Sequence, residues 1–160
     1  MVNLFDKFEI INNMKKLDFR AKKSFGQNFL IDNNICSKIA SSIPEKFNDT
    51  VIEIGSGFGN LTYILAKKFK QVLSIELDNK LYSFISTEMS DFKNIKFINQ
   101  DVLKININNI IFSNFQNFSN ASFITLKSNS SFLQFSFLVF SNEITAESTF
   151  GAGKKQFLET

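Results

Sequence analysis

Three closely spaced glycines form the most chemically informative turn in this sequence. Gly55, Gly57 and Gly59 directly follow the β-branched segment 50–54. Glycines after a strand let the backbone approach a ligand closely, because no Cβ atom intervenes. The helix that follows such a turn offers free N–H groups and a positive dipole end to a carboxylate or phosphate. Nicotinamide-binding loops place their third glycine one residue later, so a nicotinamide cofactor fits this spacing less well.

Two carboxylates follow the next two predicted strands. Glu76 ends the segment 71–76, where a carboxylate can accept hydrogen bonds from both hydroxyls of a ribose. Asp101 comes just past the segment 95–98, where it can accept a hydrogen bond from an adenine amino group. Three successive strand ends would then supply a turn, a ribose acceptor and a base acceptor. The alternative is that both carboxylates only cap the helices or loops that follow them.

An alternation of strands and helices would bring these residues to one edge of a sheet. Helices with one apolar face follow the candidate N-caps Asp32 and Asp78, and another follows the glycines. The predicted strands are 50–54, 71–76, 95–98, a candidate fourth at 109–113, and an apolar central strand at 132–140. This order predicts an α/β fold with a parallel sheet and right-handed crossovers. We therefore expect one edge of the sheet to carry Gly55, Glu76, Asp101 and Asn114.

The composition argues against several classes of function. The chain of 160 residues is predicted to be one domain and contains no His, so it lacks the commonest general base and metal ligand, and we expect no metal. Cys36 is the single cysteine, and we interpret it as a small core residue. No run of 18 apolar residues and no signal-peptide pattern occur. We expect a cytoplasmic monomer without membrane contact.

Basic residues gather near the N-terminus, although the net charge is only +3. This cluster contains one acid, Asp18, and the cations Lys15, Lys16, Arg20, Lys22 and Lys23. Such a cluster attracts phosphate backbones, and Lys22 and Lys23 are our candidate RNA-binding residues. We expect residues 1–21 to form a basic, weakly patterned N-terminal arm. The alternative is that this arm is only solvated and partly disordered and binds no phosphate.

Four segments occur in an order that is typical of one family. They are Lys23-Ser-Phe-Gly-Gln-Asn-Phe-Leu-Ile-Asp32, Val51-Ile-Glu-Ile-Gly-Ser-Gly57, Ile75-Glu-Leu-Asp78 and Asn99-Gln-Asp-Val-Leu-Lys104. Together they resemble the ribosomal RNA adenine dimethyltransferases, in the small-subunit branch, which is related to the erythromycin-resistance methylases. The resemblance implies a Rossmann-like methyltransferase domain over residues 22–150, S-adenosylmethionine as cofactor, and methylation of adenine N6 in ribosomal RNA. It also implies that the cofactor is bound by Asn28, Leu30, Gly55, Glu76 and Asp101.

The catalytic turn of that family has no intact counterpart. Its members position adenine with an Asn-X-Pro-Tyr (or Phe) turn after the fourth strand, whereas Pro44 is the only proline here. Asn114 is the best remnant, and Asn117 and Asn120 compete for the same role. We expect residues 151–160 to form a tail. We also expect the last strands of the sheet and the C-terminal helical RNA-binding domain to be absent, through truncation, a frameshift or divergence.

Three functions remain open at this stage. The leading one is methylation of ribosomal RNA adenine during ribosome biogenesis, with the small ribosomal subunit as partner. Gly26-Gln-Asn-Phe-Leu30 favours the small-subunit adenine pair over the large-subunit adenine tied to antibiotic resistance. A catalytically inactive or truncated relative would bind only cofactor or RNA. A small-molecule methyltransferase would share the glycine turn but would not explain segment 23–32.

Overall fold

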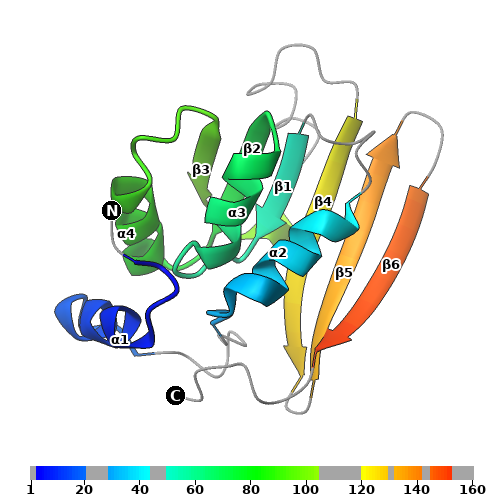
Figure 1. Cartoon of the computed structure of the whole chain (residues 1–160). Coiled ribbons are helices and arrows are strands. Elements are labelled where there is room, and N and C mark those ends of the chain that lie inside the picture. The colour runs from blue at the N-terminus through cyan, green and yellow to red at the C-terminus, as the bar shows by residue number, and fades with distance from the viewer. Residues whose placement is uncertain are drawn as a thin grey trace.

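The computed structural model describes residues 3–20, 29–43, 50–104, 120–129, 132–141 and 145–152, which build a six-stranded sheet with helices (Figure 1). The strand order is β3-β2-β1-β4-β5-β6. The strands are β1 (Thr50–Ile54), β2 (Gln71–Glu76), β3 (Ile95–Asn99), β4 (Asn120–Asn129), β5 (Phe132–Ser141) and β6 (Thr145–Ala152). The helices are α1 (Lys7–Lys16), α2 (Asn33–Ser42), α3 (Asn60–Lys68), α4 (Asn79–Glu88) and the short 3₁₀ helix η3 (Val102–Lys104).

The centre of the sheet is parallel, as the alternation of elements predicts. β1 pairs in parallel with both β2 and β4, and β2 pairs in parallel with β3. The crossover from β1 to β2 contains α3, and the crossover from β2 to β3 contains α4; both move in the same direction along the strand order. Because such connections are right-handed, both helices lie on the same face of the sheet. The carboxyl ends of β1, β2 and β3 therefore share one edge. The α/β fold class and the three strands that carry the motifs are confirmed.

The predicted N-caps start their helices where the sequence indicates. Oδ1 of Asp32 accepts hydrogen bonds from the backbone N–H groups of Asn34 and Ile35 at the start of α2. Oδ1 of Asp78 does the same for Lys80 and Leu81 at the start of α4. Each cap satisfies N–H groups that have no partner within the helix. The second cap also fixes where the chain turns after β2.

The core between the helices and the sheet contains the apolar side chains that the sequence pattern predicts to be buried. α2 and α3 pack on Val51 and Val72, and Cys36, which is fully buried, belongs to this cluster. Burial raises the pKa of the Cys36 thiol, which makes the thiolate unfavourable. The interpretation of Cys36 as a core residue is confirmed. Within the described residues no helix is long and apolar enough to cross a membrane.

The strands after β3 differ from the prediction. The candidate fourth strand at 109–113 lies outside the described residues, and the strand that pairs with β1 is β4, with Ile54 opposite Thr125. Because β4 begins at Asn120, Asn114 precedes this strand instead of following it. Asn114 itself lies outside the described residues, so its expected place at the carboxyl edge of the sheet stays a prediction.

The apolar segment 132–140 forms β5, an interior strand between β4 and β6, but it is antiparallel to both. Only residues 130–131 connect β4 to β5, and a parallel connection needs a crossover of a dozen or more residues. The sheet is therefore mixed, with a parallel centre and two hairpins. β6 continues through Ala152, past the predicted domain boundary at residue 150.

The N-terminal segment contains a docked helix. Asp6 caps α1 by accepting hydrogen bonds from the N–H groups of Phe8 and Glu9, and Ile10 is almost fully buried. Ile10 belongs to a cluster with Phe19, Phe29, Phe58 and Leu81, so α1 packs against the glycine turn. The polar arm expected over residues 1–21 thus includes an ordered helix. Its signal in the sequence is an Asp three residues before a Glu, followed by apolar residues at helical spacing.

Candidate functional site

The turn after β1 has the backbone conformation that only glycine adopts readily. Gly55, Gly57 and Gly59 have φ angles of 81°, 56° and 83°. The Gly55 N–H donates to the Ile75 carbonyl oxygen at 2.8 Å, which continues the pairing of β1 with β2. The Gly59 N–H donates to the Ser56 carbonyl oxygen at 2.8 Å, closing the turn before α3 begins. The turn is therefore fixed to the sheet at one end and to α3 at the other.

Neighbouring side chains cover this turn at Gly57 and Gly59, whereas the turn is open at Gly55. A Cβ atom on Gly57 would lie 3.0 Å from Cδ1 of Phe29, and one on Gly59 would lie 2.5 Å from Cε of Met89. A Cβ atom on Gly55 would meet nothing within 4 Å. The open space beside Gly55 gives a ligand direct access to the backbone of the turn.

Aromatic rings hold the covered side of the turn. Phe58, inside the turn, is 2% exposed. Its ring centroid lies 4.8 Å from that of Phe29, 5.9 Å from that of Phe19 and 5.5 Å from that of Phe84, always edge to face. Such pairs add stabilisation beyond the burial of their area. The turn is therefore held by side chains from the segment after α1, from residue 29 and from α4.

Glu76 ends β2 and joins the glycine turn to the start of α4. Its Oε2 accepts a hydrogen bond from the Gly57 N–H at 2.8 Å, and its Oε1 accepts one from the Asp78 N–H at 2.9 Å. Burial raises the pKa of Glu76, while these N–H groups act in the opposite direction. Each carboxylate oxygen keeps a further lone pair, so the group can still accept ligand hydroxyls.

The end of β3 is tied to the same turn. The side-chain amide of Asn99 donates to the carbonyl oxygen of Glu76 at 2.9 Å and to that of Leu77 at 3.3 Å. Asp101 follows, and its Oδ1 accepts a hydrogen bond from the Leu103 N–H at 3.0 Å, so it caps η3. Its other oxygen lies 3.8 Å from Nζ of Lys104. Asp101 therefore caps η3, while its predicted contact with an adenine amino group stays a prediction. Asn99 is a positioning residue whose role the sequence did not reveal.

Below the glycine turn lies a small set of buried polar side chains. Glu53 on β1 is opposite Ser74 on β2 in the parallel register, and both are fully buried. One carboxylate oxygen of Glu53 accepts a hydrogen bond from the Thr62 hydroxyl, whereas Oε1 of Glu53 and Oγ of Ser56 and Ser74 have no protein partner. Burial raises the pKa of Glu53 to about 7. Buried polar atoms without partners indicate a place for a ligand group or a water molecule.

The residues predicted from the sequence fall into three groups. Gly55, Glu76 and Asp101 lie at the shared carboxyl edge of β1–β3, as expected from the topology. The side chain of Leu30 is 4% exposed and belongs to the hydrophobic core beside α2 and α3. The others lie outside the described residues: Lys22, Lys23, Asn28 and Asn114.

The arrangement suits a nucleoside ligand that also carries a positive charge. The open turn at Gly55 admits close backbone contact, and Glu76 beside it can accept ribose hydroxyls. The unpartnered oxygens of Glu53 and Ser56 accept hydrogen bonds, which a protonated amine donates. Within the described segments no three His, Cys, Asp or Glu side chains come together as a metal site.

A sequence model of the family described as ribosomal RNA adenine dimethylase matches residues 18–150 of this chain. The chain belongs to the ribosomal RNA adenine dimethylase family. The match includes the glycine turn, Glu76, Asp101, β4, β5 and the part of β6 that lies before residue 151. The suspected relationship, drawn from the four motifs, is confirmed.

Curated members of this family are similar over part of their length. Ribosomal RNA small subunit methyltransferase A of Alkaliphilus metalliredigens is 42% identical over 103 residues, which is 64% of this chain and 36% of that protein. The enzyme of the same name from Bacillus pumilus is 43% identical over 102 residues, or 64% of this chain and 35% of that protein. The chain therefore spans about a third of the length of these relatives.

A solved structure supports the fold assignment independently. The phosphoethanolamine N-methyltransferase 1 of Haemonchus contortus, solved with S-adenosylhomocysteine, matches 79% of this chain and 32% of its own. The TM-score is 0.50 and the sequence identity is 19%. At this identity the match concerns the fold, and it agrees with the α/β methyltransferase architecture.

Proposed function

We propose that this member of the ribosomal RNA adenine dimethylase family binds S-adenosylmethionine at the carboxyl edge of β1–β3 and methylates adenine N6 in ribosomal RNA. The observation that carries the proposal is the glycine turn, open at Gly55 and linked through the Gly57 N–H to the carboxylate of Glu76. The names of the curated relatives, ribosomal RNA small subunit methyltransferase A, favour the small subunit as target.

Each described residue has a defined task in this proposal. Glu76 accepts hydrogen bonds from the ribose hydroxyls, and Asp101 accepts one from the adenine amino group of the cofactor. The open turn at Gly55 lets the backbone contact the ligand, and Asn28 and the backbone of Leu30, whose side chain is buried in the core, complete the pocket. S-adenosylmethionine supplies a methyl group already activated on sulfonium sulfur. The protein then contributes mainly by positioning the target nitrogen in line with that methyl group.

The RNA side of the proposal uses residues outside the described segments. Asn114 accepts a hydrogen bond from the amino group of the target adenine, and Lys22 and Lys23 contact RNA phosphates. The target base leaves its stack to reach this edge of the sheet. The protein acts as a cytoplasmic monomer on the small ribosomal subunit during ribosome biogenesis.

A second candidate function is binding without catalysis. It is favoured by a specific observation: the sequence lacks an Asn-X-Pro-aromatic turn, and Asn114 precedes the strand beside β1. Such a protein would hold the cofactor or RNA through the same residues and would transfer no methyl group.

Two measurements separate these functions. Calorimetric titration with S-adenosylmethionine should show one binding site in the wild-type chain and in Asp91→Ala, which alters an exposed carboxylate after α4. Transfer of tritiated methyl groups to immature small ribosomal subunits should then be detected for both proteins. Cofactor binding without transfer would support the binding-only function, and the absence of cofactor binding would refute both uses of this site.

A further inference from the structure

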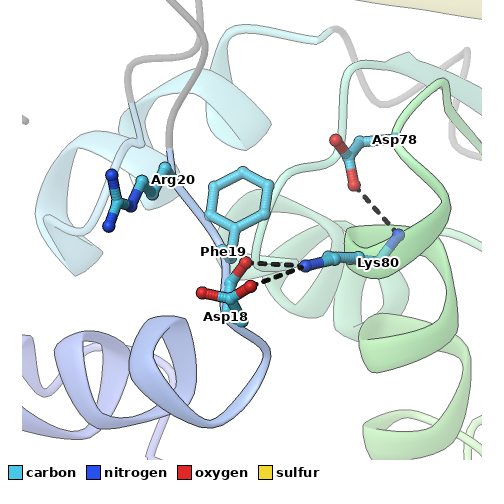
Figure 2. Close-up of a pocket in the computed structure, with 5 residues that line it drawn as sticks. All are labelled: Asp18, Phe19, Arg20, Asp78 and Lys80. Atoms are coloured by element: carbon cyan, nitrogen blue, oxygen red, sulfur yellow. Dashed lines mark hydrogen bonds and ion pairs between the residues drawn. The ribbon is translucent and has the colours of Figure 1, made fainter.

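A hollow lies beside the proposed cofactor site. It has a volume of about 320 Å³ and is lined by Asp18, Phe19, Arg20, Asp78 and Lys80 (Figure 2). Its walls come from the segment that follows α1 and from the start of α4. Asp78 donates its backbone N–H to Glu76, so the hollow and the proposed ribose site share the turn after β2.

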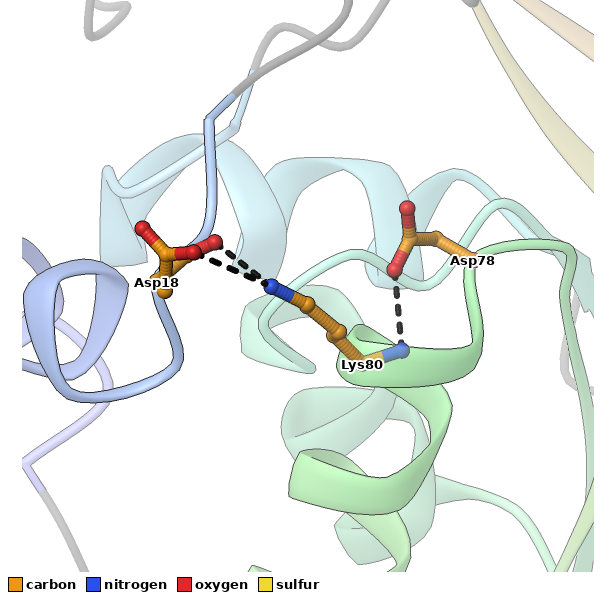
Figure 3. Close-up of polar contacts among 3 residues, drawn as sticks. All are labelled: Asp18, Asp78 and Lys80. Atoms are coloured by element: carbon orange, nitrogen blue, oxygen red, sulfur yellow. Dashed lines mark hydrogen bonds and ion pairs between the residues drawn. The ribbon is translucent and has the colours of Figure 1, made fainter.

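Lys80 ties the two walls of this hollow together. Its Nζ donates a hydrogen bond to the backbone carbonyl oxygen of Asp18 at 2.6 Å and lies 3.9 Å from Oδ2 of the same residue (Figure 3). The carboxylate of Asp18 is 96% exposed, which leaves it a weak partner for Lys80. Asp18 also has a φ of 44°, and this conformation turns the chain from α1 toward Arg20. Lys80 thus holds the backbone that presents Arg20.

Arg20 is the cation in this hollow without a protein partner among the described residues. It is exposed, and its guanidinium extends away from the contacts of Lys80 (Figure 2). In the sequence it is followed closely by Lys22 and Lys23. A guanidinium binds a phosphodiester through two parallel hydrogen bonds.

We propose that this hollow binds a backbone phosphate of the RNA substrate, with Arg20 contacting the phosphate and Lys80 acting as the positioning residue. The inference rests on the proposed function, because the phosphate would belong to the RNA strand whose adenine is methylated at the neighbouring carboxyl edge of β1–β3. Two carboxylates also line the hollow: that of Asp78, whose Oδ1 caps α4, and that of Asp18, which is exposed and lies 3.9 Å from Nζ of Lys80. Because Asp18 is the more exposed and lies next to Arg20 in the sequence region that lines the hollow, its charge opposes the phosphate there. Asp18 therefore lowers RNA affinity.

Four substitutions in the full chain test this inference. The probe is a fluorescent RNA hairpin whose loop contains two adjacent adenines, and its affinity for each protein is measured by titration at several salt concentrations. Arg20→Gln should weaken binding by roughly three- to tenfold at low salt and reduce the slope of log affinity against log salt by about one. Lys80→Met should weaken binding less, and Lys80→Arg should restore it. Asp18→Asn should tighten binding, because it removes the negative charge that opposes the phosphate. Asparagine also tolerates a positive φ, and the substitution keeps the backbone carbonyl that Lys80 contacts.

Lys93→Gln is the matched control. Lys93 is exposed and lies in the turn before β3, at the opposite edge of the sheet, where its Nζ donates to the Ser90 carbonyl oxygen. Its removal changes the net charge by the same amount as Arg20→Gln and should leave the affinity within twofold of wild type. Circular dichroism confirms that each variant is folded, and if Lys80→Met does not fold, Arg20→Gln and Asp18→Asn still decide the outcome.

The inference is overturned if Arg20→Gln and Lys93→Gln have the same RNA affinity and salt slope, if Asp18→Asn weakens binding, or if the wild-type chain does not bind the hairpin. A separate titration with S-adenosylmethionine should give the same affinity for all these variants. Loss of cofactor binding in the wild-type chain would refute the proposed function, whereas the RNA titration, which needs no cofactor, decides the phosphate site independently.

Discussion

Two regions of this sheet differ in how their strands are connected. In the crossover region, residues 50–104, a helix follows each of the first two strands and all three strands run in the same direction. In the hairpin region, residues 120–152, only residues 130–131 and 142–144 connect the strands, which alternate in direction. Every strand of the crossover region ends at one edge, whereas β5 ends at the opposite edge. The residues that follow β1, β2 and β3 therefore converge at one edge, which the carboxyl ends of β4 and β6 also reach and that of β5 does not.

This difference explains where the candidate site lies. Gly55, Glu76 and Asp101 are far apart in the sequence, yet each follows a parallel strand and so reaches the same edge. Hydrogen bonds from Gly57 to Glu76 and from Asn99 to the next turn then fix their arrangement. The site depends on the crossover region, and the hairpin region extends the sheet beside β1.

The largest expected effect tests the helix-on-sheet packing of the crossover region. Leu65 on α3 is fully buried in the core against Val51 and Val72. Leu65→Ala should lower the free energy of unfolding by about 2 to 5 kcal/mol, measured by urea denaturation, because it leaves a cavity. The neighbouring Ile64 is only half-buried, so Ile64→Ala should cost less. Equal losses would contradict the packing described for α3.

The next effect concerns the buried carboxyl group of Glu53. Burial raises its pKa from 4.5 to about 7, so the folded state binds the proton more tightly than the unfolded state. The resulting stability is fully present below pH 4.5 and is lost as the pH rises through about 7. Relative to Glu53→Gln, wild type should lose about 3 kcal/mol between pH 4.5 and pH 8, measured by denaturation at each pH.

Asp91→Asn, which neutralises an exposed carboxylate, is the control for this comparison. It should follow the same pH dependence as wild type within experimental error. If the free energy of unfolding of wild type and of Glu53→Gln changes equally with pH across this range, the folded state does not raise the pKa of Glu53, and the prediction is wrong.

A smaller effect separates the covered and open parts of the glycine turn. Gly55→Ala and Gly59→Ala share a strained backbone, with φ angles of 81° and 83°, but only the Gly59 Cβ would meet Met89. Thermal denaturation should show a loss of about 1 kcal/mol for Gly55→Ala and roughly 1 to 3 kcal/mol for Gly59→Ala. If Gly55→Ala is the more destabilising, the space beside Gly55 is not open.

The smallest effect concerns the link between β3 and the turn after β2. Asn99→Ala removes hydrogen bonds to the carbonyl oxygens of Glu76 and Leu77 and should lower the free energy of unfolding by about 1 kcal/mol. Because this link is local, Asn94→Ala, which removes two similar bonds to Ala66 and Phe69, provides a control at the opposite edge. Asn99→Ala should weaken cofactor binding, whereas Asn94→Ala should not.

The sequence predicts the crossover region well and the hairpin region poorly, for a physical reason. Alternating apolar strands, capped helices and a glycine turn carry local signals, so the strands at 50–54, 71–76 and 95–98 and the caps Asp32 and Asp78 are found where expected. The pairing partner of β1 carries no such signal, because it depends on contacts between residues distant in the sequence. The predicted strand at 109–113 lies outside the described residues, and β4, which pairs with β1, was not predicted from the sequence.

The sequence likewise predicts which residues of the site face the ligand, but not the neighbouring side chains that hold those residues in place. Glu76 and Asp101 follow from topology, whereas the docking of α1, the ring of Phe29 against Gly57 and the amide of Asn99 depend on three-dimensional packing. The unpartnered oxygens of Glu53, Ser56 and Ser74 also emerge only when strand register is known.

The central claim is that the carboxylate of Glu76 binds the ribose of S-adenosylmethionine at the open glycine turn. Calorimetric titration of wild type, Glu76→Ala and the control Asp91→Ala tests it most directly. Glu76→Ala should weaken binding by roughly 1 to 3 kcal/mol, as expected for charge-assisted hydrogen bonds, while Asp91→Ala binds like wild type. An unchanged affinity in a folded Glu76→Ala protein would contradict the claim.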